Sequence, residues 1–142
     1  MNKSVPKKPD QTMAQQVAEA ARAFQYRQTG HAPRTVTVVL SDDTLVVTLH
    51  QALSPAEIAL SQTPDGAAQV QRYHRQLFES SAAVLREEIR RITGFAVREA
   101  AVEVETTSGA VVHAFTSGTM VQVFRLDGSI LAENWNGPGN EA

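Results

Sequence analysis

The stretch RTVTVVLSDDTLVVTL, residues 34–49, holds two runs of Val, Leu and Thr on either side of Ser41-Asp42-Asp43. Such runs around a turn signal predict a β-hairpin with strands at 34–40 and 44–49. If Asp42-Asp43 forms a two-residue turn, the facing pairs are Val36 with Leu49, Val38 with Val47 and Leu40 with Leu45. All six side chains then lie on one face, and a one-residue slip would destroy that sorting. The sorting of these side chains therefore predicts a hairpin with a single register.

A helix is predicted before the hairpin. Thr12 is a suitable N-cap, and Gln15 stands three residues later, where a capping box requires it. Apolar residues follow at helical spacing: Met13, Val17, Ala20 and Phe24. Gly30 suits the C-terminal cap, and Pro33 prevents the helix from resuming.

Two more helices are predicted after the hairpin. Ser54, Pro55 and Glu57 fit the N-cap, N1 and N3 positions of a short helix that runs to about residue 62. A long helix follows at 64–93 and ends at Gly94. Its expected apolar stripe is Val70, Tyr73, Leu77, Val84, Leu85, Ile89 and Ile92. We expect this helix to pack across the full sheet, with part of the stripe available to a dimer partner.

Residues 97–126 predict two or three further strands. Two alternating sets follow in residues 99–106, as in a sheet with one solvated face: Ala100, Val102, Val104 and Thr106 on one side, and Glu99, Ala101, Glu103 and Glu105 on the other. A turn at 117–118 would pair Phe115 with Met120, His113 with Gln122, and Val111 with Phe124. Both faces of that hairpin are apolar, so we expect each to be covered, one of them by a subunit partner.

The predicted fold is a single-domain, two-layer α+β fold in the order α-β-β-α-α-β-β, with an optional last strand. The helices are expected on one face of a mainly antiparallel sheet. We assign residues 1–11 to a disordered basic tail, 12–126 to the domain and 127–142 to a flexible C-terminal tail.

Composition excludes several classes of function. The chain has 142 residues, no cysteine and a net charge of −2. Thiolate catalysis, disulfide scaffolds, iron–sulfur clusters and cysteine-based zinc sites are thereby excluded. A nucleic-acid partner would favour a basic excess, which is absent. The longest stretch without charged residues, 106–124, is too polar for a membrane span, so we expect a soluble, cytoplasmic domain without direct membrane insertion.

The sequence contains few candidates for catalytic, metal-binding or cofactor-binding residues. The four histidines (His31, His50, His74 and His113) show no metal-ligand spacing, and no glycine-rich phosphate motif is present. We therefore expect no metal, no cofactor and no catalytic residue. Asp42 and Asp43 fit solvated turn residues, and the N3 position is a sufficient role for Glu57. On the long helix, Glu87 and Arg91 fit an exposed i,i+4 ion pair.

Two short motifs, together with their order along the chain, resemble those of a bacterial family. Gly30-x-x-Pro33 and Ser54-Pro55-x-Glu57, together with the hairpin and the long helix ending in Ile92-Thr93-Gly94, are similar to the MpsC family over residues 12–105. The family was long catalogued as a domain of unknown function. Its label refers to a Na⁺-translocating, membrane-potential-generating system. The resemblance implies an association with cation-coupled membrane transport, including uptake of inorganic carbon, but it carries over no catalytic residue. Beyond Glu105 the chain departs from the pattern.

Two functions of different classes follow as expectations. The first is a non-enzymatic accessory or regulatory domain, a homodimer whose partner is a membrane transporter complex. The alternative is a small-anion-binding domain or enzyme, with Arg34, Asp42, Asp43 and His50 as ligand-binding residues. Arg34 would bind the anion.

Overall fold

The hairpin at residues 34–49 forms one half of a four-stranded sheet in the computed structural model, which describes residues 11–105 and 118–137. Its strands are β1 (Thr35–Ser41) and β2 (Thr44–His50). The three predicted apolar pairs face each other in the predicted register. At the turn, Asp42 takes a left-handed φ of 54°, a conformation that aspartate tolerates better than most residues.

The other half of the sheet consists of β3 (Val97–Glu105) and β4 (Thr119–Leu126). The strand order is β1-β2-β4-β3, and every neighbouring pair is antiparallel. The predicted pairing across a turn at 117–118 is wrong. Met120 faces Leu49 on β2 and Val104 on β3, and Phe124 likewise has partners on both sides. β4 needs apolar residues because it is a central strand. The predicted partners Val111, His113 and Phe115 lie outside the described residues.

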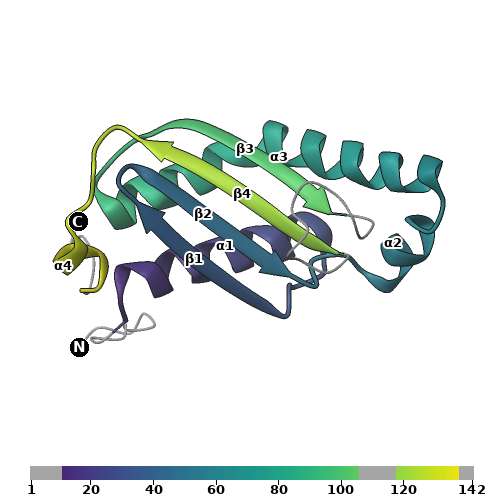
Figure 1. The fold of residues 1–142 in the computed structure, drawn as a ribbon, viewed down its shortest axis with the longest axis horizontal. Coiled ribbons are helices and arrows are strands. Elements are labelled where there is room, and N and C mark those ends of the chain that lie inside the picture. Colours follow the sequence, from purple (N-terminus) through teal and green to yellow (C-terminus); the bar gives the residue numbers. More distant parts are fainter. Residues whose placement is uncertain (1–10, 106–117, 138–142) are drawn as a thin grey trace.

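Two helices cover one face of the sheet, as predicted. α1 (Met13–Thr29) packs against β1 and β2, whereas α3 (Pro64–Thr93) packs against α1 and β3. Figure 1 shows both helices on the same side of the sheet. The expectation that the long helix crosses the full sheet is thereby corrected, because α1 already occupies half of that face.

The helix ends follow the predicted signals. Thr12 and Gln15 form a complete capping box at the start of α1, and Gly30 ends that helix with a left-handed φ of 77°. Ser54 and Glu57 form the same box at the start of α2 (Pro55–Leu60). α3 begins and ends at the predicted residues, with Gly94 as its left-handed cap. These side-chain and cap contacts satisfy backbone groups that a helix end otherwise leaves without partners.

The core lies between the helices and the sheet. Phe78 of α3 contacts Phe24 edge-on, with ring centroids 6.4 Å apart, and Phe124 at 6.0 Å. The predicted α3 stripe needs two corrections, since Tyr73 and Val84 are about half exposed. The buried positions instead include Val70, His74, Phe78, Leu85, Ile89 and Ile92. The i,i+4 step from Val70 through His74 to Phe78 keeps one face turned inward.

The exposed face of α3 carries ion pairs of a different spacing from that predicted. Glu87 pairs with Arg90, and Glu88 pairs with Arg91, so both pairs are i,i+3. Both spacings bring side chains together on a helix surface, and here the shorter one is adopted.

The segment after β4 packs against the domain as far as residue 137. Ile130 and Trp135 are buried, and Trp135 lies in a short helix, α4 (Ala132–Trp135). The N–H of Met13 donates to the C=O of Gly137 at 2.7 Å. The prediction of a flexible tail is therefore wrong for residues 127–137. Burial of Trp135 removes most of its apolar surface from water and holds this segment against the domain. Residues 1–10 and 138–142, the remaining parts of the predicted tails, lie outside the described residues.

No helix within the described ranges combines the length and the apolar character that a membrane crossing requires.

Candidate functional site

The two sequence motifs meet at one end of the molecule. α1 ends at Gly30, whose N–H donates to the C=O of Tyr26, and the chain then passes through buried Pro33 into β1. β2 returns to the same end and leads into Ser54, the cap of α2. The His31 ring, through Nε2, makes a 3.1 Å hydrogen bond with the C=O of Gln51 that joins the two connections. In Figure 1 this end carries α2, and α4 lies at the opposite end.

A cavity of about 410 Å³ lies where α1, α2 and α3 meet. We call it the corner cavity. Its lining includes Thr29, Ser54, Glu57, Leu60, Val70 and Tyr73. Most of this lining is apolar or uncharged, and Glu57 is its one ionisable carboxylate among the described residues.

Glu57 uses both carboxylate oxygens. Oε1 accepts from the N–H of Ser54 at 2.9 Å, and Oε2 lies 2.6 Å from Nε2 of His74. Burial raises the pKa of Glu57, but the hydrogen bonds from His74 and from the Ser54 backbone outweigh it and lower the pKa to about 2. Glu57 is therefore a carboxylate at neutral pH, and its bond to His74 holds α2 against α3.

His74 is the functional candidate that the sequence did not identify. Its side chain is 2% exposed and lines a second, very small internal cavity of about 10 Å³ together with Gln25, Phe78 and Met120. That volume is about the minimum for one water molecule. A sequence signal existed in the i,i+4 step from Val70 to His74, which placed the imidazole on the buried face. Its partner, 17 residues away on a different helix, left no such signal.

Apolar side chains around the corner cavity are exposed. α2 has no buried residue, and Ile58 and Leu60 project from it with 41% and 47% of their surface accessible. Tyr73 adds an aromatic ring that is 48% exposed. An exposed apolar patch beside a cavity is typical of an interaction site. The corner cavity can therefore accept an apolar side chain, with the ionised carboxylate of Glu57 in one wall.

The four predicted ligand-binding residues do not form one site. Arg34 and His50 are neighbours at the α2 end, where the N–H of Arg34 donates to the C=O of His50 at 2.9 Å. Asp42 and Asp43 occupy the turn at the far end of the hairpin, about 25 Å away at about 3.3 Å per residue. Because the turn closes one end of the hairpin, the full length of the two strands separates Asp42 and Asp43 from Arg34 and His50.

Asp43 has a structural role instead. Its carboxylate accepts from the Thr44 hydroxyl and pairs with Arg98 of β3 and Arg125 of β4. The Thr44 hydrogen bond lowers the pKa of Asp43, and together with the Arg125 guanidinium it outweighs the opposing effect of burial. This carboxylate links the β1–β2 turn to the other half of the sheet.

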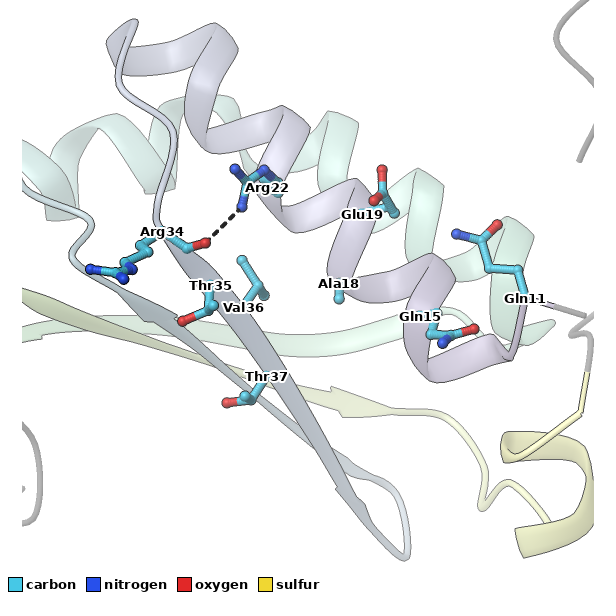
Figure 2. Close-up of a pocket in the computed structure, with 9 residues that line it drawn as sticks. All are labelled: Gln11, Gln15, Ala18, Glu19, Arg22, Arg34, Thr35, Val36 and Thr37. Atoms are coloured by element: carbon cyan, nitrogen blue, oxygen red, sulfur yellow. Dashed lines mark hydrogen bonds between the residues drawn. The ribbon is translucent and has the colours of Figure 1, made fainter. Parts of the chain in front are cut away.

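Arg34 lines a larger groove between α1 and β1 (Figure 2), with a volume of about 560 Å³. Arg22, Glu19 and Gln15 line it from α1, and Thr35 and Thr37 line it from β1. The Arg22 guanidinium donates to the C=O of Arg34 at 3.3 Å. The groove thus runs along the outer edge of the sheet.

Metal binding finds no support among the residues with described positions, where no three His, Asp or Glu side chains come together as ligands.

Comparison with known protein families identifies a match. The family model described as "Na+-translocating membrane potential-generating system (MpsC)" matches residues 10–118. It extends past Glu105, where the resemblance was expected to end. No curated protein and no solved structure matches the chain. Because the family model covers most of the sequence, including both motifs of the corner, the chain belongs to the MpsC family.

Proposed function

We propose that this protein is a non-enzymatic accessory or regulatory domain of a membrane system that translocates Na⁺. The family match over residues 10–118 is the observation that carries the proposal, since the family is described by that system. The proposal includes a cytoplasmic location and a homodimeric state.

The corner cavity is the proposed contact with the membrane system. α2 exposes more than 40% of the surface of both Ile58 and Leu60, and the hydrogen bond between Glu57 and His74 ties the helix to α3. A rigid element with exposed apolar side chains loses little conformational freedom when a partner binds. The partner segment that suits this surface carries an apolar side chain for the space beside Leu60 and Tyr73. A basic group next to that side chain would face the Glu57 carboxylate.

Affinity capture tests the proposal. The tagged protein is recovered from native cells after gentle solubilisation, and co-purifying proteins are identified by mass spectrometry. We expect stoichiometric recovery of a membrane-embedded transport protein by the natural chain. The double variant Leu60→Ala/Tyr73→Ala should lose it.

Val84→Ala is the matched control, because Val84 is an exposed apolar residue of the same long helix and lies outside the cavity lining. It should capture the same transport protein as the natural chain. Recovery of the tagged protein alone would overturn the accessory role. Undiminished capture by the double variant would overturn the role of the corner cavity.

A further inference from the structure

The two edges of the sheet differ in their protection against strand pairing. β3 has an irregular register between Val97 and Glu99 and carries Arg98, Glu99, Glu103 and Glu105. Bulges and charged residues of this kind normally prevent an edge strand from pairing with another chain. β1 has the sequence TVTVVLS, with no charge and no proline, and its seven pairs with β2 are unbroken. Among the described residues, the β3 edge is therefore protected against strand pairing, whereas the β1 edge is not.

The backbone of β1 has groups available for another strand. Leu126 N–H donates to Asp43 C=O, so alternate residues of β2 from Asp43 onward are directed to β4. The intervening residues of β2 bond to β1, and their partners include Thr37 and Val39. The N–H and C=O groups of Val36, Val38 and Leu40 then point away from the sheet.

Space and side chains at this edge suit an added strand. The groove of Figure 2 lies along β1 and provides room on the α1 side. On the opposite face Val39 is 60% exposed, one of the most exposed large apolar side chains of the described chain. An added strand next to β1 would cover part of that surface and form hydrogen bonds with the backbone groups that point away from the described sheet.

We propose that a second copy of this chain occupies the edge, with β1 paired antiparallel to β1 of the other copy and Val38 on the two-fold axis. The inference rests on the homodimer proposed above and names its interface. The two sheets become one sheet of eight strands.

The register follows from the symmetry. An interface with two-fold symmetry must be complementary to itself. With Val38 on the axis, all seven residues of β1 pair. The inward side chain of Val36 faces Leu40 of the second copy, and the outward Thr37 faces Val39. No charge opposes a like charge. The same pairing of β3 strands would bring glutamates together, which disfavours that edge.

Cysteine cross-linking tests the register, because the natural chain has no cysteine. Thr37→Cys and Val39→Cys are made separately and mixed under mild oxidation. Thr37 and Val39 of the second copy form a non-hydrogen-bonded pair, with Cα atoms about 4.5 Å apart, within the range of a disulfide. We expect the mixture to form a covalent dimer in at least about tenfold greater yield than either variant alone, since self-pairs are diagonal neighbours about 7 Å apart. Ala101→Cys on β3, also exposed, is the control and should not cross-link.

Light scattering coupled to size exclusion separates the two proposals. A dimer in solution with the expected cross-link supports both. A dimer without it, or with the Ala101→Cys link instead, overturns the β1 interface and leaves the homodimer standing. A monomer at all concentrations overturns both. Thr37→Lys/Val39→Lys should convert the dimer to a monomer with an unchanged circular dichroism spectrum, because facing lysines repel.

Discussion

Replacing Glu57 with glutamine tests the polar link between α2 and α3. Glutamine can take the N3 position of a capping box, as Gln15 does in α1, so the start of α2 should persist. The substitution removes the carboxylate that lies 2.6 Å from His74 Nε2. We therefore expect a loss of stability that comes from this charge and not from the helix cap.

The magnitude follows from the pKa. The pKa of Glu57 falls from 4.5 in the unfolded chain to about 2 on folding. At about 1.4 kcal/mol per pKa unit, this decrease sets an upper limit of about 3.5 kcal/mol on the loss of stability. The side chain is 19% exposed, so water screens part of the interaction. We expect a loss of roughly 1–2 kcal/mol at pH 7, which lowers the melting temperature by about 3–6 °C for a chain of this size.

The pH dependence has a definite sign. Because folding lowers the pKa, the ionised carboxylate stabilises the protein fully above the unfolded value of 4.5. That stabilisation is lost as the pH falls through 4.5 toward 2. The melting temperatures of Glu57→Gln and the natural chain should therefore converge at low pH, with more than half of the difference gone by about pH 3.

Thermal unfolding followed by circular dichroism between pH 7 and pH 3 is the assay. Glu79→Gln makes the same change in net charge at an exposed position of α3 and serves as the control. Equal melting temperatures of the natural chain and Glu57→Gln at pH 7 would refute the reasoning. So would a difference that stays constant down to pH 3.

Three further substitutions test other parts of the fold by urea denaturation. Trp135→Ala should cost about 2–4 kcal/mol because the ring is 91% buried, whereas a residue in a flexible tail would cost almost nothing. Gly66→Ala should cost roughly 1–3 kcal/mol, since a Cβ there would lie 1.8 Å from the C=O of Leu60; an unchanged midpoint would contradict that contact. Gln122→Leu should stabilise the protein by roughly 1–2 kcal/mol, because its buried amide finds no hydrogen-bond partner among the described residues; destabilisation would show that the amide is satisfied.

Local signals account for the elements that the sequence predicted well. The ends of α3 and the register of the β1–β2 hairpin depend on residues that are close in the chain. Thr63 caps the start of α3 by accepting from the N–H of Gly66, Gly94 caps its end, and facing valines align the hairpin. Capping and alternation act over a few residues, so a single sequence is enough to identify them.

The errors concern contacts between distant segments. The sequence predicts a hairpin between β4 and the residues just before it, but the partners of β4 are β2 and β3, which no local pattern distinguishes. The turn-forming residues around Trp135, such as Asn134 and Gly137, favour a tail, although the burial of Trp135 itself anchors the segment. For the site, local signals identify Ser54 and Glu57 as helix-start residues, but the histidine that pairs with Glu57 lies on a different helix.

The hydrogen bond between Met13 and Gly137 has a practical consequence for attaching this domain to other molecules. It brings the first and last described segments together at the end opposite the corner cavity, and α3, with 30 residues, separates these ends by about 45 Å. A fluorophore, an affinity resin or a fused protein joined next to either segment is therefore held away from α2. Immobilised in this way, the domain would present its cavity outward to a partner in solution.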